Sequence, residues 1–435
     1  NQGIGSRGGF GGVGGSGGEG AEGAEGGAGG GGSTDGADGM DNTGTVAPGG
    51  DGGNGGNGGN ASPDGARTWA GAIYFGENCE VDISDTIIAN NATTTIPRID
   101  PFDPNAPGYD PNAFQPGTGG APGTDGAAGG PGSAGSSSDP SSVTTFGGGN
   151  YYESGVKIKM TNCIISYNAS EQHDGGGEYY SEGSTGIYNQ SDFIGNFARY
   201  GGGQFFDPCC SIEMKDCEYG GNVATRDGGG LFIRFECALD IDDSKFSGNV
   251  ALGSGGGVYG GGEFDLEQSV WYNNSTIKVE DTEFYRNLAG FGGGLYWHGE
   301  DSEVTVSYSK FDDNTADTGG GLYFSRGAPK IIGCTITNND ADDTLTVDPT
   351  AITPYPVIGT IFGDVTYGGG GGIFCWSSDA RIEDCLITDN SSSGSGGGVY
   401  LGGDPSAPLL RNCLIKENSS AIDGGGIVAN WFVEP

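Results

Sequence analysis

The strongest constraint on the fold of this chain is a repeating unit of about 27 residues that opens with three glycines. Residues 228–254 are one such unit and read GGGLFIRFECALDIDDSKFSGNVALGS. The triplets that define the repeat begin at Gly147, Gly175, Gly201, Gly228, Gly255, Gly292, Gly319, Gly396 and Gly424. Most successive triplets are 26 to 28 residues apart, and the interval from Gly255 to Gly292 is 37 residues. A fixed period of this size predicts a repeat architecture.

Three columns of residues recur in register in ten units. The small column consists of Thr86, Cys163, Ser191, Cys217, Ser244, Thr282, Ser309, Cys334, Cys385 and Cys413. The apolar column lies two residues further on and consists of Ile88, Ile165, Phe193, Tyr219, Phe246, Phe284, Phe311, Ile336, Ile387 and Ile415. The asparagine column follows three residues later and consists of Asn91, Asn168, Asn196, Asn222, Asn249, Asn287, Asn314, Asn339, Asn390 and Asn418.

These patterns predict an all-β parallel β-helix, or β-solenoid, of about ten coils. The apolar spacing is two within short runs, and Gly, Asn and Asp break the runs, which is typical of strands and turns. A unit of this size cannot bury its own apolar face, so neighbouring units must stack, with two or three strands per coil. We expect the asparagines to form a ladder, because Asn tolerates left-handed backbone and its amide can bond to the copies above and below.

The repeats resemble those of a known bacterial family. The runs at 193–196, 246–249, 284–287 and 311–314 are similar to the FxxN motif of polymorphic outer-membrane protein repeats. The Gly-Gly-Gly-aliphatic runs are similar to that family's GGA-aliphatic motif, with Gly in place of Ala. The resemblance covers about residues 69 to 433. It implies a right-handed parallel β-helix, the pectate-lyase-like fold, in a cell-surface protein that is often an adhesin.

The chain divides into a glycine-rich N-terminal arm, residues 1–66, and the β-helix, residues 67–435. Two insertions, 94–145 and 344–367, follow the asparagine turns of their units, so we expect both to leave the same corner of the coil. The first insertion contains the sequence Asp-Pro-Asn-Ala twice, beginning at Asp103 and at Asp110. These two aspartates are candidate metal ligands, and a rigid surface loop is the alternative.

The charge balance restricts the partners. The chain has 57 acidic and 18 basic residues and a net charge of −39. This excludes nucleic acid as an expected partner, because binding phosphates requires positive charge. The acidity suits either solubility or the binding of divalent cations, and calcium is the cofactor we consider. No run of 18 apolar residues predicts a membrane span.

The ten cysteines do not form the framework of a small disulfide-rich domain. Five belong to the small column, where we expect small buried hydrophobes. Cys210 and Cys237 each precede the small residue of adjacent units by seven positions. Stacked neighbours meet the Cα separation that a disulfide needs, so this pair is a candidate disulfide, with strained geometry as the argument against it.

We find no catalytic constellation and expect that the protein is not an enzyme. The acidic residues are scattered over turns, and basic residues do not recur beside them. His173 and His298 are isolated in different units, whereas a general base needs partners.

The first functional hypothesis is an extracellular structural or adhesive protein that assembles head-to-tail into a filament, sheath or surface layer on a bacterial cell. Its partner would be a second copy of itself, with Trp431 and Phe432 as buried anchors of the contact. The second hypothesis is a polysaccharide-binding or polysaccharide-cleaving protein, by analogy of fold alone. The third is an adhesin passenger domain released from a larger precursor.

Overall fold

The computed structural model describes residues 67–68, 70–93, 144–261, 263–265, 270–272, 274–342, 368–403 and 406–430. The arm 1–66, the insertion 344–367 and nearly all of the insertion 94–145 lie outside this part of the chain. The chain divides into two compact units, one of residues 1–68 with 96–144 and one of residues 69–95 with 145–435. β1 (Arg67–Thr68) and β6 (Thr144–Thr145) form a two-stranded sheet of their own.

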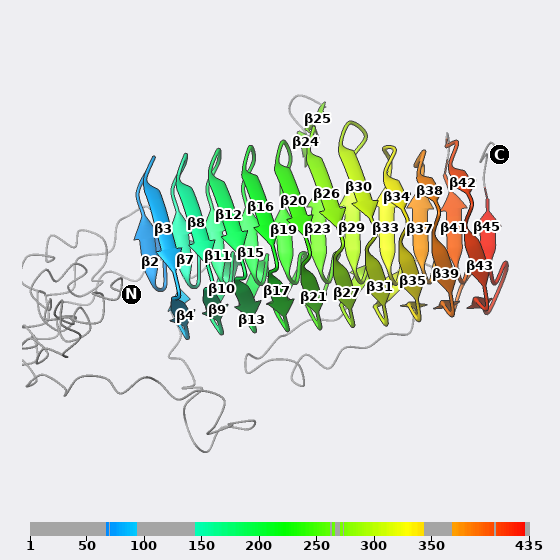
Figure 1. Cartoon of the computed structure of the whole chain (residues 1–435), viewed down its shortest axis with the longest axis horizontal. Helices are drawn as coiled ribbons and strands as arrows, with labels where there is room; N and C mark the ends of the chain where they lie inside the picture. The colour runs from blue at the N-terminus through cyan, green and yellow to red at the C-terminus, as the bar shows by residue number, and fades with distance from the viewer. Residues whose placement is uncertain are drawn as a thin grey trace, which may run out of the picture. The chain divides into compact units, whose positions relative to one another are not determined.

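The second unit consists of four long sheets in which all neighbouring strands are parallel (Figure 1). Sheet I contains β2 (Ile73–Phe75), β7 (Asn150–Tyr152), β11 (Glu178–Tyr180), β15 (Gln204–Phe206), β19 (Leu231–Ile233), β23 (Val258–Gly261), β29 (Leu295–His298), β33 (Leu322–Ser325), β37 (Ile373–Trp376), β41 (Val399–Gly402) and β45 (Ile427–Ala429). Sheet II contains β3 (Glu80–Ser84), β8 (Lys157–Thr161), β12 (Thr185–Asn189), β16 (Ser211–Lys215), β20 (Ala238–Asp242), β26 (Thr276–Glu280), β30 (Glu303–Ser307), β34 (Lys330–Ile332), β38 (Arg381–Glu383) and β42 (Leu409–Arg411).

The other two sheets complete each coil. Sheet III contains β4 (Ile87–Ala89), β9 (Ile164–Ser166), β13 (Asp192–Ile194), β17 (Glu218–Gly220), β21 (Lys245–Ser247), β27 (Glu283–Tyr285), β31 (Lys310–Asp312), β35 (Thr335–Thr337), β39 (Leu386–Thr388) and β43 (Leu414–Lys416). Sheet IV contains β5 (Ala92–Thr93), β10 (Ala169–Asp174), β14 (Phe197–Tyr200), β18 (Val223–Ala224), β22 (Val250–Ala251), β28 (Leu288–Phe291), β32 (Thr315–Thr318), β36 (Asp340–Ala341), β40 (Ser391–Ser392) and β44 (Ser419–Ser420).

The predicted parallel β-helix of about ten coils is therefore confirmed, with four strands per coil rather than two or three. Coil 1 contains β2 to β5, coil 2 contains β7 to β10, and the count continues to coil 10, which contains β41 to β44. Several strands of sheet IV have only two residues, which is too short to show an alternating pattern in the sequence. Among the described residues, no helix is long and apolar enough to cross a membrane.

Two coils differ from the regular pattern of glycine triplets in the sequence. Coil 6, which contains the long interval, carries an antiparallel hairpin of β24 (Glu263–Asp265) and β25 (Val270–Tyr272). Coil 9 opens with a triplet at Gly370, inside a run of five glycines, that the sequence analysis did not count as a start. Gly370 has the same positive φ as the first glycine of the other triplets.

The glycine triplets form the corner between sheets IV and I. Gly228, the first residue of its triplet, has φ of 71°, a conformation that residues with side chains rarely adopt. A Cβ on the second glycine, Gly229, would lie 2.4 Å from the carbonyl oxygen of Gly256 in the next coil. The corner therefore requires glycine for both its turn and its close stacking.

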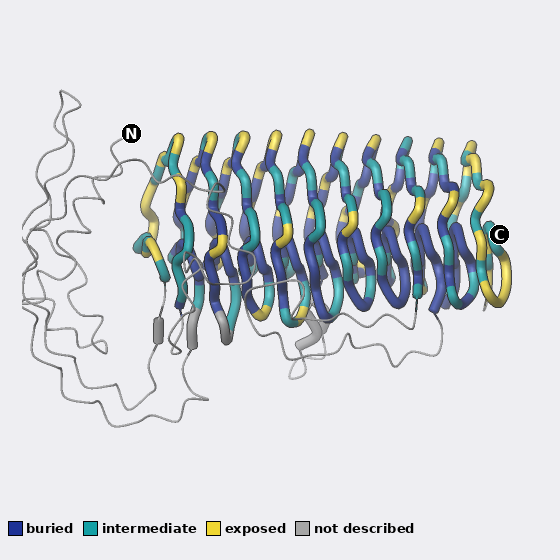
Figure 2. The backbone as a smooth tube through the Cα atoms, turned by 90° about the horizontal axis from the view of Figure 1, so that it is seen from below, coloured by how far each residue is buried: buried dark blue, intermediate teal, exposed yellow. Residues whose placement is uncertain are grey.

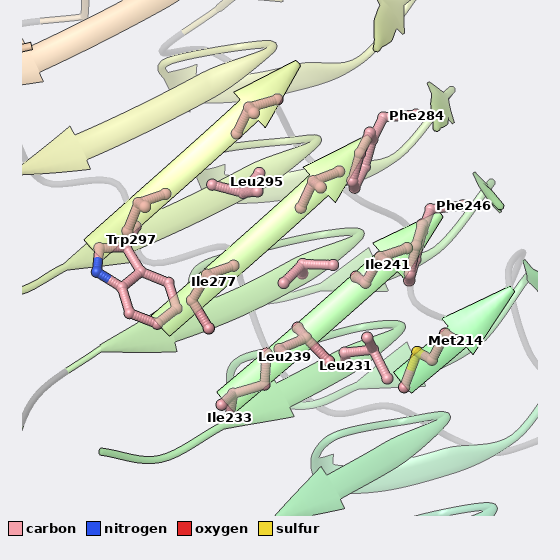
Figure 3. Packing of buried hydrophobic residues seen from close by; sticks show 14 of the residues in the cluster. Met214, Leu231, Ile233, Leu239, Ile241, Phe246, Ile277, Phe284, Leu295 and Trp297 are labelled. Atoms are coloured by element: carbon pink, nitrogen blue, oxygen red, sulfur yellow. The ribbon is translucent and has the colours of Figure 1, made fainter. Parts of the chain in front are cut away.

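The interior of the solenoid is packed with rings and aliphatic side chains that stack from coil to coil (Figure 3). The apolar column contributes Phe193, Tyr219, Phe246, Phe284 and Phe311, all fully buried, with successive ring centroids 4.5 to 5.0 Å apart. These are the aromatic residues of the FxxN-like motifs and one tyrosine at the same position. The repeated motif thus builds the core.

A second aromatic stack runs along the outer face of sheet I. Its members are Tyr74, Tyr151, Tyr179, Phe205, Phe232, Tyr259, Tyr296, Tyr323, Phe374 and Tyr400. Successive ring centroids are 4.6 to 5.5 Å apart, and the ring planes are within 20° of parallel. Stacked aromatic pairs stabilise a sheet beyond their buried area.

Candidate functional site

The asparagine column forms a continuous ladder of hydrogen bonds between coils. For example, the backbone N–H and Nδ2 of Asn222 both donate to Oδ1 of Asn249 in the next coil, at 3.0 and 2.9 Å. Nδ2 of Asn222 also donates to the carbonyl oxygen of Phe193 in the preceding coil, at 2.7 Å. The same step recurs from Asn91 to Asn418, and the asparagines from Asn168 to Asn390 are at most 1% exposed. Each interior asparagine therefore ties three coils together.

One predicted reason for asparagine at these positions, its tolerance of a left-handed backbone, was wrong. The left-handed residue of the turn is the one before the ladder asparagine, such as Asn90, Gly248 or Arg286, with φ of 59°, 63° and 54°. The ladder asparagines themselves do not have positive φ. Asparagine is required for its side chain, because the ladder needs an acceptor and a two-hydrogen donor on the same short group.

The ladder has a direction, because each asparagine donates to the asparagine of the next coil and accepts from the asparagine of the previous coil. At the first coil, no described residue donates a hydrogen bond to Oδ1 of Asn91. At the last, Oδ1 of Asn418 accepts from Asn390, and Nδ2 donates back to Ile387, but the described residues hold no further asparagine for its backbone N–H. Within the part of the chain that the structure describes, the two ends of the ladder are thus an open acceptor and an open donor.

The candidate disulfide between Cys210 and Cys237 is not formed, and all ten cysteines are free. The Cys210 thiol donates to the carbonyl oxygen of Ser181 at 3.4 Å, and the Cys237 thiol donates to that of Asp207 at 3.3 Å. Both side chains are buried, and they precede residues that are paired in register in β16 and β20. Each thiol therefore bonds to the backbone of the preceding coil, and a hydrogen bond with the Cys237 thiol, together with burial, raises the pKa of Cys210.

The strands at the two edges of the solenoid contain many exposed residues (Figure 2), and several of these are apolar. We call β2, β3, β4 and β5 the N-terminal edge strands and β42, β43, β44 and β45 the C-terminal edge strands, because each lies last in its sheet. Among the described residues, six of the ten exposed large hydrophobic residues belong to the first coil or to the stretch from β42 to β45: Tyr74, Ile87, Leu409, Leu414, Ile422 and Ile427. Apolar surface is therefore concentrated at the edges.

Four of the residues predicted as sites cannot be placed. The candidate contact residues Trp431 and Phe432 and the candidate metal ligands Asp103 and Asp110 lie outside the described residues.

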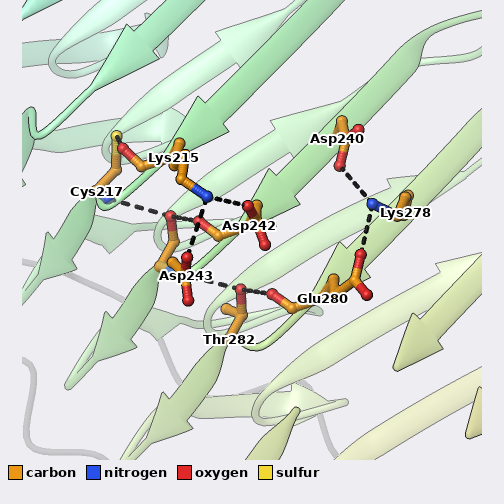
Figure 4. Close-up of polar contacts among 9 residues, drawn as sticks. Lys215, Cys217, Asp240, Asp242, Asp243, Lys278, Glu280 and Thr282 are labelled. Atoms are coloured by element: carbon orange, nitrogen blue, oxygen red, sulfur yellow. Dashed lines mark hydrogen bonds and ion pairs between the residues drawn. The ribbon is translucent and has the colours of Figure 1, made fainter. Parts of the chain in front are cut away.

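Ion pairs connect neighbouring coils on the outer face of sheet II (Figure 4). Lys278 contacts Asp240 of the preceding coil at 3.6 Å and Glu280 of its own strand at 2.6 Å. Most of these side chains are about half exposed, so each pair contributes little, at about 0–1 kcal/mol. Opposite charges instead face each other on neighbouring coils. They therefore favour the native pairing of the strands over a pairing in a shifted register.

One carboxylate cluster on this face has the composition of a cation site. The carboxylate oxygens of Asp242, Asp243 and Asp281 lie within 4.8 Å of one another. Carboxylate oxygens are the ligands that calcium prefers. The ammonium group of Lys215 already bonds to both Asp242 and Asp243, so part of the negative charge is neutralised by the protein itself (Figure 4).

Two carboxyl groups near the corner between sheets IV and I, Asp174 at the end of β10 and Asp207 after β15, interact through their charges. Asp207 accepts a hydrogen bond from the Tyr179 hydroxyl and is paired with Arg234 at 3.1 Å. Burial, assisted by the charge of Asp207, raises the pKa of Asp174 to about 7. The sequence analysis did not connect these residues, because they come from different coils.

The interior of coils 2 to 4 contains a buried acid that the sequence analysis also missed. Glu178 is fully buried, and five side chains donate hydrogen bonds to its carboxylate: Asn150, Tyr152, Tyr180, Tyr188 and Gln204. The signal in the sequence was the first residue after three successive triplets, which is Asn150, Glu178 and Gln204 where other units have an aliphatic residue.

The family comparison agrees with this architecture. A family model described as "Right handed beta helix region" matches residues 269–430. Together with the parallel sheets, the match shows that the solenoid is right-handed, so the fold is a right-handed parallel β-helix. Neither the curated proteins nor the solved structures yielded a match to the chain.

Proposed function

We propose that the protein is an extracellular structural or adhesive β-solenoid that assembles head-to-tail into a filament, sheath or surface layer. The observation that carries the proposal is the exposure of apolar side chains on the edge strands. Leu414 is 55% exposed and Ile427 is 43% exposed, whereas Val399, which precedes Ile427 in the same column, is fully buried. Unpaired strand edges with apolar side chains are a template for pairing with another chain.

The residues on the two edges continue the columns of the solenoid. If β45 paired with β2 of a second copy in the register used throughout sheet I, Ile427 would stack on Ile73 and Val428 on Tyr74. The small Ala429 would then face the larger Phe75, as the small Gly260 faces Trp297 inside the solenoid. A contact between unlike edges does not close on itself, so repeated contacts give a filament.

The direction of the asparagine ladder supports the same arrangement. The open backbone N–H of Asn418 on one copy would meet the open Oδ1 of Asn91 on the next. A pairing of two like edges would instead place donor against donor or acceptor against acceptor. The ladder therefore favours head-to-tail association over a symmetric dimer.

Electron microscopy and analytical ultracentrifugation of the purified 435-residue chain test this proposal. We expect rods whose length and sedimentation coefficient increase with protein concentration. Monodisperse short rods at every concentration, with and without calcium and across a range of salt, would contradict it.

A surface location on a bacterium is part of the proposal and rests on the resemblance to polymorphic outer-membrane repeats. Release from a larger adhesin precursor is compatible with it, and the parent gene would show the additional domains.

A polysaccharide-binding or polysaccharide-cleaving role is the second candidate. The charge interaction between the carboxyl groups of Asp174 and Asp207 favours it, because glycoside hydrolysis uses a pair of carboxyl groups. An activity screen on acidic polysaccharides, with Asp207→Asn as the control, tests the enzymatic form. Turnover that the control variant abolishes would support it, and the absence of turnover with or without calcium would reject it. The outer aromatic stack does not offer ring faces on which a sugar could pack, because each ring covers the face of the next one.

A further inference from the structure

The polar interior of coils 2 to 4 differs from the rest of the solenoid at one position. The first residue of each sheet I strand points inward, and in β19, β23, β29 and β33 it is Leu231, Val258, Leu295 and Leu322, each fully buried. In β7, β11 and β15 the same position holds Asn150, Glu178 and Gln204, which are also fully buried. Three consecutive coils therefore replace an aliphatic column by an amide, an acid and an amide.

Glu178 is held entirely by neutral donors. Oε1 accepts from Nδ2 of Asn150 at 2.9 Å and from the Tyr152 hydroxyl at 2.8 Å. Oε2 accepts from Nε2 of Gln204 at 2.8 Å, from the Tyr188 hydroxyl at 2.5 Å and from the Tyr180 hydroxyl at 3.4 Å. None of the ion pairs between described residues involves Glu178. The charge of an ionised Glu178 is thus stabilised only by dipoles.

Two opposing effects act on this carboxyl group. Burial disfavours the charged form, and the hydrogen bonds favour it. Burial dominates and raises the pKa of Glu178 to about 7, from an ordinary value of 4.5. The carboxyl group therefore changes its protonation state in the neutral pH range while it remains enclosed.

Burial raises the pKa of four titratable groups that surround Glu178. From sheet I, Tyr152 and Tyr180 face it, and burial raises the pKa of both hydroxyls well above the usual 10. Tyr188 of β12 bonds to it directly, and Tyr219 of β17 and the thiol of Cys163 are the other titratable neighbours. Burial also raises the pKa of Tyr219 and of Cys163. No lysine, arginine or histidine among the described residues bonds to Glu178.

The network can accept the proton without a change of packing. A protonated Glu178 must donate one hydrogen bond, so one neighbouring hydroxyl must become an acceptor. Tyr188 can do this, because its hydroxyl also contacts that of Tyr180, and either oxygen can be the donor in that contact. Reversal of one tyrosine hydroxyl therefore satisfies the neutral acid.

We propose that Glu178 makes coils 2 to 4, residues 146–227, a pH-sensitive segment that loses stability as the pH rises through neutrality. The coils that follow have an aliphatic column at this position and keep their stability. Between pH 4.5 and about 7 the folded chain holds a proton that the unfolded chain has released. Stability falls with rising pH wherever the folded state binds more protons, so the loss develops across this window and is complete above it.

Urea unfolding of the wild type and of Glu178→Gln at pH 4.5 and pH 8.5 tests the proposal. The difference of about 2.5 pKa units between 4.5 and 7 corresponds to a change of about 300-fold in the unfolding equilibrium constant. We expect the ratio of the wild-type to the variant constant to increase toward that limit between the two pH values. Glu213→Gln, the same substitution at an exposed position of β16, should leave the wild-type pH dependence unchanged. The carboxyl group of Asp174 titrates in the same range and is common to all three proteins.

Hydrogen exchange provides a second readout, which locates the effect along the wild-type chain. The same measurement on Glu178→Gln separates the effect of Glu178 from that of Asp174, which should persist in the variant. After correction for the intrinsic rate, we expect amides in β7, β11 and β15 to exchange faster at pH 8.5 than at pH 6. Amides in β29 and β33 should show no such change. Equal pH dependence in the two sets of strands, or a constant ratio between wild type and Glu178→Gln, would overturn the proposal.

Discussion

The interior coils and the C-terminal edge strands use the same residue columns in different environments. Ile387 in β39 is fully buried, whereas Ile415, the next member of its column in β43, is only partly buried. Val399 in β41 is fully buried, and Ile427 in β45 is 43% exposed. The repeat therefore encodes a coil that is complete only when another coil covers it. In the proposed head-to-tail assembly, the same column that stabilises the interior forms the contact at the edge.

The size of this effect follows from the transfer of apolar groups out of water. Complete burial of a Leu or Ile side chain contributes about 1.5–3 kcal/mol. Leu414 and Ile427 are each exposed by 43% or more, so covering the edge recovers a part of this amount for each of them. The comparison predicts large stability losses for interior substitutions and association losses for edge substitutions.

The largest expected difference is in the apolar column. Phe311→Ala removes a fully buried ring that stacks 4.5 Å from Phe284, and it should lower the free energy of unfolding by about 3–5 kcal/mol. Ile415→Ala at the edge should cost about 1 kcal/mol, because its site is partly solvated already. Urea melts of the two variants measure this difference. Equal losses would mean that the edge is as well covered as the interior.

The asparagine ladder gives a smaller difference of the same kind. Asn249→Ala removes the acceptor for both donors of Asn222 and the donor to the carbonyl of Tyr219, all in buried surroundings. We expect a loss of about 2–4 kcal/mol, since each buried group left without a partner costs about 1–3 kcal/mol. Asn418→Ala should lower monomer stability by less than about 1–2 kcal/mol, because Asn418 is only half-buried. A loss at Asn418 as large as that at Asn249 would mean that the end of the ladder is as well enclosed as its interior.

The smallest expected effect concerns cations. With a net charge of −39, neighbouring copies repel each other unless counter-ions screen them. We expect excess chelator to lower the melting temperature of the assembled chain by a few degrees. A monomeric edge variant should melt at the same temperature with and without chelator. An unchanged melting curve of the assembled chain would show that divalent cations have no structural role.

The fold could be predicted from the sequence because the core is periodic. Each of Phe246, Phe284 and Phe311 occupies one fixed position in its unit, and only stacked strands bury such a column. The tenth triplet was missed because Gly370 lies within five consecutive glycines, where the start of the unit cannot be located by counting. The left-handed position was misplaced by one residue, because the residue before the ladder varies in type, as Gly248 and Arg286 show.

The buried acid could not be identified from periodicity alone. Glu178 follows its triplet in register, but a pattern of apolar residues gives no sign that an acid points inward. Its donors come from β7, β11, β12 and β15, so their convergence depends on three coils lying in register. The free thiols of Cys210 and Cys237 show the same limit, because stacking predicts their proximity but not the carbonyl groups that each thiol faces.

Sedimentation of one pair of matched variants tests head-to-tail assembly most directly. Ile427→Asp places a charge on a C-terminal edge strand, and Ile187→Asp places the same charge on the outer face of β12, at nearly the same exposure of 43% and 42%. We expect the wild type and Ile187→Asp to form concentration-dependent polymers and Ile427→Asp to remain a folded monomer. Polymers of Ile427→Asp as long as those of Ile187→Asp would contradict the account.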